Sequence, residues 1–441
     1  MPRTTIRAGI RAARYGPARV MARRPGTESR ERAVEEALAT LPERYLGGPD
    51  GLDAVYRITF EDLGCVWEVR LGPDAATVRE GAGRRRPDVE ISTDAATWLA
   101  LRRGALSGVD AFAARRLRAR GDLDLAVAFE SFFRRPGGRG PRLRLRRLAL
   151  GGGRDVSVLT LGRGPDVVLV HGLGGTKSSF FETAAALAAG GHRVHALDLP
   201  GFGASSKPLR APYDAPWFAA AVLDAMDALG VARAGLAGNS MGGRVAIEAA
   251  LAAPERVAGI ALLCPAVAFP KRTLHPLVAL LRPELGLLPH AIPRALVARQ
   301  LWSLFGDREA IDAALADVVV DGFRRTYASA GARHAFLASA RNLYLEAPFG
   351  RRGFYPRLAG LRTPALFVWG SEDRLVPAAL RHVVYDWLPH ARQTVLEGCG
   401  HVPQVERPDE VNPMLLRFFG RCLGADAAGP AASPSRAELA A

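Results

Sequence analysis

The feature that most constrains this chain is a serine between glycines, in the sequence Gly-Asn-Ser-Met-Gly-Gly at residues 238–243. Small apolar residues precede it, as in a buried strand, and residues 244–251 have a helical pattern. A serine between such a strand and helix stands on a tight, strained turn that exposes its hydroxyl. Ser240 is therefore the candidate nucleophile, and Gly238 and Gly242 relieve the crowding that the turn creates.

A serine hydroxyl needs a general base, and that base needs a carboxylate to fix its tautomer. His401 is the candidate base because it follows the last strand-like run, in a loop that contains glycine. Asp373 is the candidate acid because it follows the preceding strand-like run, at residues 365–369. Its neighbour Glu372 is the alternative acid, but the spacing from the strand favours Asp373. The remaining histidines lie outside such contexts, so we interpret them as surface or packing residues.

A second glycine-rich segment, His-Gly-Leu-Gly-Gly at residues 171–175, ends another apolar run. Its glycines allow backbone N–H groups to turn toward an oxyanion that develops during acyl transfer. We expect the donors to be the N–H groups of Leu173 and Met241, with Gly172 supporting the loop. His171 is interpreted as a structural residue that anchors the loop, and a role as second base is the alternative.

Apolar strand-like runs alternate with helical patterns over residues 151–423. The runs lie at residues 167–170, 194–197, 235–237, 260–263, 365–369 and 393–396. This alternation predicts an α/β fold with a mostly parallel sheet, helices on both faces and functional loops at the carboxyl ends of the strands. Residues 265–360 read as a helical cap, whose apolar content either favours a hydrophobic acyl substrate or packs the cap on the core.

These motifs, with Asp-Leu-Pro-Gly at residues 198–201, resemble the α/β-hydrolase superfamily over most of residues 151–423. The resemblance implies a catalytic triad of Ser240, Asp373 and His401. Serine at the turn argues against the dehalogenases and epoxide hydrolases of that superfamily, which use aspartate there. The remaining choices are serine esterases or lipases and carbon–carbon bond hydrolases. The latter usually have a Gly-Pro-Gly type of loop, so Leu-Gly-Gly at residues 173–175 favours an esterase.

Residues 30–133 form a separate part, in which strand-like runs are followed by three predicted helices, at residues 95–103, 109–117 and 123–133. This order predicts a small α+β domain. Two stretches, at residues 88–94 and 117–133, are similar to the late strand and the final helix of the sterol carrier protein type 2 family. The resemblance implies an apolar tunnel that binds acyl chains, sterols or other lipids.

The two resemblances together predict a serine hydrolase that cleaves a hydrophobic, lipid-like ester, with an amino-terminal domain that binds or presents lipid. A carbon–carbon bond hydrolase and a lipid carrier with a secondary hydrolase module are the alternatives. The four cysteines are isolated from one another and from paired histidines, so no metal site or redox motif is expected, and no cofactor is implied. Their isolation fits a reducing compartment, and we expect a cytoplasmic location.

The net charge is +15, and residues 1–150 hold +10 of it. Only three of the 59 basic residues are lysines, which codon preference explains. Residues 134–147 contain seven arginines and no acid, so we interpret residues 134–150 as an arginine-rich linker with a weak attraction to anionic membrane surfaces. No pattern of nucleic-acid binding is found. A basic segment at residues 1–29 and a disordered tail at residues 424–441 complete the predicted organisation.

Overall fold

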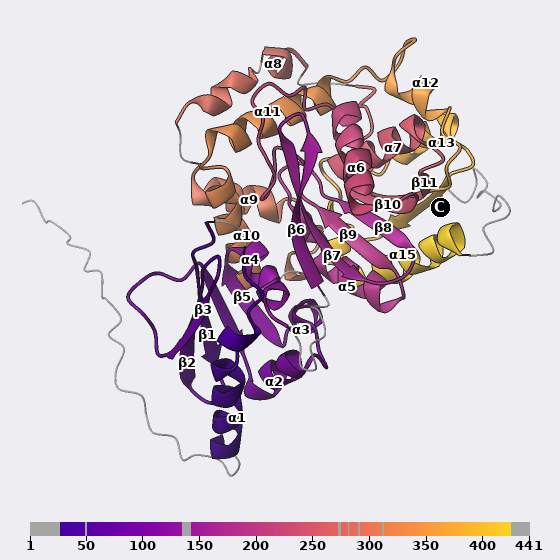
Figure 1. Cartoon of the computed structure of the whole chain (residues 1–441). Coiled ribbons are helices and arrows are strands. Elements are labelled where there is room, and N and C mark those ends of the chain that lie inside the picture. The colour runs from indigo at the N-terminus through magenta and orange to yellow at the C-terminus, as the bar shows by residue number, and fades with distance from the viewer. Residues whose placement is uncertain are drawn as a thin grey trace, which may run out of the picture.

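The computed structural model describes residues 27–48, 51–134, 143–271, 275–280, 282–289, 292–310 and 313–424. Two sheets organise this part of the chain, one of five strands and one of eight (Figure 1). The smaller sheet belongs to the amino-terminal domain and the larger one to the domain that carries Ser240.

The amino-terminal domain is a small α+β layer, as predicted. Its sheet has the order β3-β2-β1-β4-β5, antiparallel except for the parallel pair β1–β4. The strands are β1 (Ala54–Phe60), β2 (Cys65–Leu71), β3 (Ala76–Glu80), β4 (Val89–Thr93) and β5 (Leu117–Gly121). The helices are α1 (Thr27–Ala39), α2 (Ala95–Arg103), α3 (Gly108–Ala113) and α4 (Leu123–Ala128), with 3-10 turns η1 (Pro42–Arg44) and η2 (Phe129–Phe132).

Two predictions for this domain are corrected. Residues 117–121 form the edge strand β5, although the sequence predicts a helix at residues 109–117 and assigns no strand before the next helix at residue 123. The strand is short and mostly exposed, since only Ala119 is buried, so its apolar alternation is weak. The predicted helix at residues 123–133 keeps its α-helical form only to Ala128 and then tightens into η2.

The larger domain contains the predicted, mostly parallel sheet, in the order β13-β12-β11-β10-β8-β9-β7-β6. Five neighbouring pairs are parallel, and the two pairs that involve β7, with β9 and with the edge strand β6, are antiparallel. All six predicted runs are strands. The strands are β6 (Leu143–Gly151), β7 (Arg154–Gly162), β8 (Asp166–Val170), β9 (Arg193–Leu197), β10 (Ala234–Asn239), β11 (Val257–Leu263), β12 (Ala365–Gly370) and β13 (Arg392–Leu396).

Helices cover both faces of this sheet. Side chains of α6 (Ala215–Leu229), α7 (Met241–Ala252) and α13 (Leu380–Trp387) share one hydrophobic cluster with it. Those of α5 (Phe181–Ala189) and α15 (Pro408–Leu423) share the cluster on the other face. A parallel sheet buried on both faces is built from continuous apolar runs, which is why its strands could be recognised in the sequence.

The predicted arginine-rich linker is wrong over residues 143–150, because these residues form β6 and pair with β7. Leu143 is buried and Leu145 is half-buried, whereas Arg144 and Arg146 between and beside them are exposed. The arginines therefore occupy the solvent side of an edge strand, and the Pro- and Gly-rich part of the run, at residues 135–142, lies outside the described residues. The basic segment up to residue 26 and the tail from residue 425 also lie outside them.

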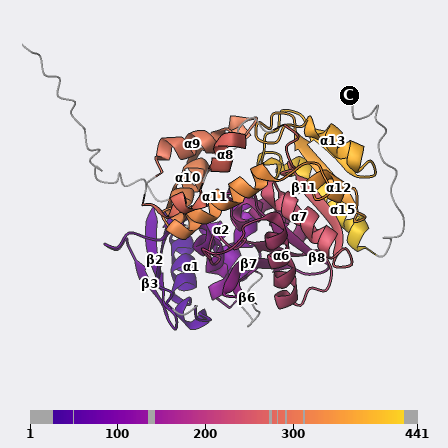
Figure 2. The ribbon, with the colours of Figure 1, turned by 90° about the horizontal axis from the view of Figure 1, so that it is seen from above.

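A group of helices between β11 and β12 occupies the predicted cap region (Figure 2). Its α-helices are α8 (His275–Leu280), α9 (Arg294–Trp302), α10 (Ala313–Thr326), α11 (Ala330–Leu345) and α12 (Phe354–Leu358). Two 3-10 turns, η5 (Pro283–Leu287) and η6 (Arg308–Ala310), connect them. In both views α9 and α10 lie on the side of the amino-terminal domain, and Arg325 of α10 donates a hydrogen bond of 2.6 Å to the carbonyl of Gly121 at the end of β5.

A buried lysine joins the two domains. Lys177, in the 3-10 turn η4 (Lys177–Phe180) of the larger domain, is 1% exposed. Its Nζ lies 2.7 Å from Oδ2 of Asp124 in α4 and 2.6 Å from Oδ2 of Asp198, which follows β9. The domains therefore meet through a charged group that water cannot solvate, so their relative position is tied to this ion triad.

Candidate active site

Ser240 occupies a strained turn between β10 and α7, as the motif predicts. Its φ and ψ are 54° and −117°, which few residues other than glycine adopt. The two flanking glycines are required by space, because a Cβ on Gly238 would lie 2.2 Å from the carbonyl oxygen of Gly242. A Cβ on Gly242 would lie 2.0 Å from the carbonyl oxygen of Val170. The backbone at the half-buried Ser240 is therefore strained, and the flanking glycines lack the side chains that would prevent this conformation.

The predicted oxyanion loop lies directly beside this turn. A Cβ on Gly172 would lie 3.1 Å from Cβ of Ser240, so the loop and the serine are in close contact. Met241 is the first residue of α7, where a backbone N–H has no partner within the helix, and the helix dipole favours negative charge. Within the described part of the chain, the N–H groups of Leu173 and Met241 donate to no other group. Both predicted donors are therefore available to an oxygen beside Ser240.

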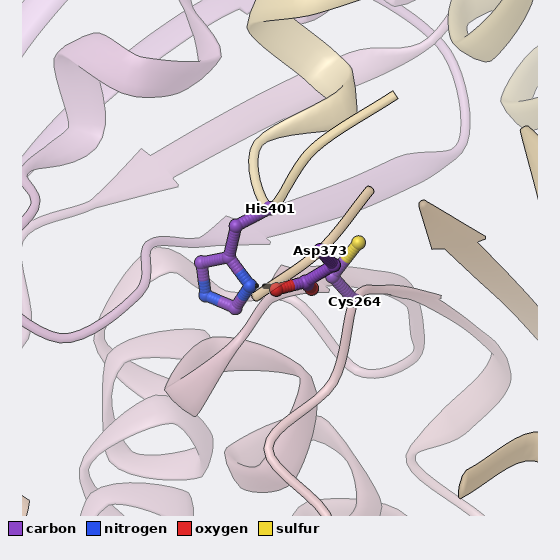
Figure 3. Close-up of side chains that lie close together, drawn as sticks. All are labelled: Cys264, Asp373 and His401. Atoms are coloured by element: carbon purple, nitrogen blue, oxygen red, sulfur yellow. Dashed lines mark hydrogen bonds and ion pairs between the residues drawn. The ribbon is translucent and has the colours of Figure 1, made fainter. Parts of the chain in front are cut away.

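The structure joins the predicted base and acid. Nδ1 of His401 lies 2.7 Å from Oδ2 of Asp373, and both side chains are nearly fully buried (Figure 3). The other carboxylate oxygen, Oδ1, accepts hydrogen bonds from the backbone N–H groups of Leu375 and Val376, at 2.8 and 2.9 Å. These bonds fix the carboxylate, which in turn orients the imidazole so that Nε2 is the free nitrogen.

The hydroxyl of Ser240 is not hydrogen-bonded to His401 among the described residues, but a different contact ties the two residues together. Nδ2 of Asn239 donates to the carbonyl oxygen of His401 at 2.9 Å and to that of Leu263 at 3.0 Å. Catalytic hydrogen bonds are often long in structures without substrate, so the loop contact is the firmer sign that the two segments are held together. Sequence reasoning missed Asn239, although it lies inside the motif.

Glu406 is a second residue that the sequence did not single out. Its buried carboxylate accepts three backbone hydrogen bonds, from Gly400 at 2.8 Å, Gly306 at 3.0 Å and Asp307 at 2.8 Å. Gly400 precedes His401, whereas Gly306 and Asp307 belong to the cap. The cap also accepts a hydrogen bond of 2.6 Å from the backbone N–H of His401, at the carbonyl of Leu304. The cap and the histidine loop therefore share one set of hydrogen bonds.

Family models match both parts of the chain. The model described as alpha/beta hydrolase fold matches residues 165–408, which is more than half of the chain and includes every residue of the site described above. The chain belongs to the alpha/beta hydrolase fold family. The model described as SCP-2 sterol transfer family matches residues 38–134, so this alpha/beta hydrolase carries an SCP2 domain at its amino-terminal side, as both resemblances predict.

Relatives of the alpha/beta hydrolase domain act on different bonds. The chain is 29% identical to a 2-hydroxy-6-oxononadienedioate/2-hydroxy-6-oxononatrienedioate hydrolase of Paraburkholderia phymatum, over 64% of this chain and 93% of the relative. It is 30% identical to a pimeloyl-[acyl-carrier protein] methyl ester esterase of Aeromonas hydrophila, over 60% of this chain and the whole relative. A crystal structure of a membrane phospholipase A aligns with a TM-score of 0.52 and 31% identity, over 64% of this chain and 88% of that chain.

His171 has the structural environment expected for a residue that anchors the oxyanion loop of this alpha/beta hydrolase. It is fully buried, and Nε2 accepts a hydrogen bond of 3.0 Å from the backbone N–H of Leu199. Nδ1 then carries the proton and donates to the carbonyl of Gly172 at 2.7 Å. Burial lowers the pKa of His171, which keeps the ring neutral. Both ring nitrogens are used, so the alternative of a second base finds no support.

A metal ion has no ready place at the hydrolase site. Cys264, Asp373 and His401 each offer one atom, and these atoms lie within 4.8 Å of one another, with Asp373 between the other two (Figure 3). However, His401 and Asp373 use their facing atoms on each other. Burial, with the Asp373 carboxylate nearby, raises the pKa of Cys264 well above its usual value, so the thiol stays protonated. The three side chains are therefore better explained as a candidate base and acid, His401 and Asp373, beside the protonated thiol of Cys264.

Glu372, the alternative acid, and Cys399, which lies two residues before His401, differ from Asp373 and His401 in their surroundings. Glu372 is exposed, and its backbone N–H donates a hydrogen bond of 2.9 Å to the carbonyl of Cys399. Cys399 is buried, and burial raises its pKa to about 12, so no reactive thiolate forms there. Among the described residues no helix is long and apolar enough to cross a membrane.

Proposed function

We propose that the chain is a serine hydrolase that cleaves a hydrophobic carboxylic ester through an acyl-enzyme. The observation that carries the proposal is the buried His401–Asp373 pair, whose loop is bonded to the turn that presents Ser240. Ser240 would attack the ester carbonyl while Nε2 of His401 takes the hydroxyl proton. The N–H groups of Leu173 and Met241 would hold the oxyanion, and loss of one such donor typically costs ~3–4 kcal/mol of transition-state stabilisation.

The second half of the reaction follows from the same geometry. The protonated His401 gives its proton to the departing alcohol oxygen, and the acyl group remains on Ser240. Water then attacks the acyl-enzyme with His401 again as base, which releases the acid and restores the serine. Asp373 stays ionised throughout and stabilises the imidazolium. No step needs a metal ion or an organic cofactor.

Two neighbours of the candidate site, the SCP2 domain and the cap, support a lipid-like substrate. An SCP2 domain, from a family described by sterol transfer, is packed against it through Lys177. The cap places aromatic side chains over the oxyanion loop, since Phe336 and Phe323 lie 3.1 and 3.3 Å from the position of a Cβ on Gly174. We propose that the amino-terminal domain binds lipid and raises its concentration near the cap.

The lipid role is tested most cleanly in the full chain. Removal of residues 1–150 would delete most of β6 and expose Lys177, so its effect would mix folding with lipid supply. A small cavity between the sheet and helices α2, α3 and α4 of the SCP2 domain is lined by Ala119, and filling it by Ala119→Leu avoids this problem. We expect kcat/KM for a C16 ester to fall several-fold more than kcat/KM for a C4 ester. An equal loss on both esters would contradict a role in lipid supply.

Carbon–carbon bond hydrolysis is the second candidate, because the relative from Paraburkholderia phymatum bears the name of such a hydrolase. The two candidates differ in the bond that breaks, so matched substrates distinguish them. A panel of p-nitrophenyl esters and a 2-hydroxy-6-oxo-dienoate is assayed with the wild-type chain. Turnover of esters alone supports the esterase proposal, whereas turnover of the ketone with no acyl-enzyme from any ester would replace it.

A further inference from the structure

The oxyanion loop is anchored at both of its ends to the segment that follows β9. At the first end, Nε2 of His171 accepts a hydrogen bond of 3.0 Å from the N–H of Leu199. Just past the other end, the N–H of Lys177 donates to Oδ1 of Asp198 at 2.7 Å. Leu173, a candidate oxyanion donor, lies between these two anchors among three glycines. Because glycine fixes no conformation by itself, the position of the Leu173 N–H depends on both anchors.

The second anchor is built on a carboxylate with no room to move. The side chain of Asp198 is fully buried, and its Oδ2 accepts a hydrogen bond of 2.9 Å from the N–H of Ala204. A Cβ on Gly203 would lie 2.3 Å from Cγ of Asp198, so the backbone packs directly on the carboxylate. Oδ2 also lies 2.6 Å from Nζ of Lys177. The lysine therefore binds Asp198 twice, through its backbone N–H and through its ammonium group.

One group from the amino-terminal domain completes this anchor. Oδ2 of Asp124, in the first turn of α4, lies 2.7 Å from Nζ of Lys177. Among the described residues, the ammonium bonds only to Asp124 and Asp198. The Lys177 side chain is 1% exposed and that of Asp124 is 20% exposed, so water reaches the ammonium only past Asp124. Without Asp124 a buried cation would lose one acceptor and turn toward the water that replaces it.

The chain that follows Lys177 also lies against the amino-terminal domain. The turn η4 leads directly into α5, and Phe181, the first residue of α5, is buried. Phe181 lines a small cavity together with Trp98 and Phe129 of the amino-terminal domain. Residues 177–181 are thus held by contacts from the other domain, and the residues just before them form the oxyanion loop.

We propose that the amino-terminal domain positions the oxyanion loop of the hydrolase domain, and that Asp124 is a positioning residue that acts through Lys177. Asp124 touches no reacting atom. It holds the ammonium of Lys177, which keeps the end of the loop on Asp198 and the Leu173 N–H beside Ser240. The inference rests on the proposed ester hydrolysis and goes beyond it, because the SCP2 domain then contributes to the chemical step as well as to the supply of substrate.

The test uses the full-length chain and p-nitrophenyl butyrate, a water-soluble ester for which lipid supply plays no part. Asp124→Ala is compared with Arg325→Ala, which removes another hydrogen bond between the domains, to the carbonyl of Gly121, and leaves the loop anchors intact. We expect Asp124→Ala to lower kcat roughly 10-fold with KM within about 2-fold of the wild-type value, because a displaced donor weakens the transition state more than the bound substrate. Arg325→Ala should change neither constant.

A reversible inhibitor separates positioning from a loss of folded protein. Ser240 adds to the carbonyl of an alkyl trifluoromethyl ketone while His401 takes the hydroxyl proton, and the oxyanion of the adduct lies where that of the transition state lies. In Asp124→Ala the inhibition constant of this ketone should rise by about the factor by which kcat/KM falls. A smaller fraction of folded enzyme would lower kcat but would leave the inhibition constant unchanged.

Each other outcome has a defined meaning. Wild-type values of kcat and of the inhibition constant in Asp124→Ala overturn the positioning role and leave the proposed hydrolysis intact. A lower kcat with an unchanged inhibition constant overturns it as well, because Asp124 then serves folding alone. Equal effects in Arg325→Ala overturn the assignment to Asp124.

If Asp124→Ala does not fold, Asp124→Asn takes its place, since it keeps the shape of the side chain and loses the charge. We expect a several-fold rise of the inhibition constant in Asp124→Asn, and an unchanged value overturns the proposal. A wild-type chain that neither hydrolyses esters nor binds the ketone contradicts the proposed function itself, and the inference falls with it.

Discussion

The side-chain amide of Asn239 donates a hydrogen bond of 2.9 Å to the backbone carbonyl of His401. The residue that precedes the candidate nucleophile therefore holds the loop that carries the candidate base. The same amide binds the carbonyl of Leu263 at the end of β11, so three loops at one edge of the sheet meet on one side chain. Asn239 touches no reacting atom and acts by positioning.

Replacing Asn239 should distinguish an effect on the position of His401 from an effect on substrate binding. In Asn239→Ala two buried carbonyls lose their donor, at a cost of about 1–3 kcal/mol in the free energy of unfolding. We expect kcat on a short-chain ester to fall roughly 10- to 100-fold with little change in KM, because a displaced base lowers the rate rather than the affinity. Asn342→Ala, which removes an amide of α11 that binds the carbonyls of Pro212 and Tyr213, is the control. An unchanged kcat in Asn239→Ala contradicts the role.

Because Glu406 binds both the cap and the loop before His401, its replacement should lower stability and activity together. Glu406→Ala leaves the buried N–H of Gly400 and the partly buried N–H groups of Gly306 and Asp307 without an acceptor, so we expect the free energy of unfolding to fall by about 1–3 kcal/mol. Esterase activity should fall as well, since the loop before His401 loses its support. Glu410→Ala alters an exposed glutamate on α15 and should change neither value. Denaturant unfolding and an ester assay on both chains check this, and wild-type behaviour of Glu406→Ala would refute it.

Residue 172 has no room for a side chain, and an activity assay can test this. A Cβ there would lie 3.1 Å from both Cβ of Ser240 and Oδ1 of Asn239, which is tighter than ordinary packing. Gly172→Ala should therefore shift the oxyanion loop away from Ser240 and lower kcat/KM by about 10-fold. Gly420→Ala adds the same methyl group in open space on α15 and should leave activity intact. Equal activities of the two variants would show that the loop tolerates the methyl group.

The ion triad between the domains predicts a pH dependence of stability. Asp124 shares the cation of Lys177 with Asp198, and burial raises the pKa of Asp124 to about 6, with Asp198 and Asp122 also raising it. The unfolded chain loses this proton near its ordinary pKa of 3.8, so the folded state holds it more tightly. The stability that Asp124 contributes is therefore present at low pH and lost as pH rises through about 6.

Asp124→Asn keeps the shape of the protonated acid and removes its titration. We expect its unfolding free energy to exceed that of the wild type increasingly between pH 4 and pH 6.5, by about 1–3 kcal/mol at the upper end. Guanidinium unfolding at closely spaced pH values measures this, with the exposed Asp409→Asn as control. A loss of stability in Asp124→Asn at pH 7 would mean that the ionised carboxylate is needed for docking.

The central part of the hydrolase fold could be predicted because its signals are local. Buried parallel strands read as short apolar runs, and the turn at Ser240 requires glycines at fixed positions. The order of Ser240, Asp373 and His401 along the chain matched the order of strand ends. The hydrogen bond between Asp373 and His401 joins residues 28 positions apart, and the sequence specified it through their roles rather than through any pairing signal.

The wrong predictions concern β5 and β6, two edge strands whose solvent-exposed residues obscure the alternation typical of a strand. In β6 three arginines interrupt the apolar residues, and in β5 only Ala119 is buried, so both segments lacked a strong period. Asn239, Glu406 and the Lys177 triad were missed for another reason. Their partners are backbone groups or charges from distant segments, and single residues of those types carry no sequence signal of what they will meet.

The claim that Ser240 is an activated nucleophile is tested most directly by labelling with a fluorophosphonate probe and measuring the intact mass of the protein. The wild-type chain should gain one probe adduct, located on Ser240 by peptide mapping, and Ser240→Ala should gain none. His401→Ala and Asp373→Ala should label much more slowly, because the hydroxyl then lacks its base or the base lacks its orienting acid. Labelling of Ser240→Ala at the wild-type rate, or no labelling of the wild type, would contradict the account.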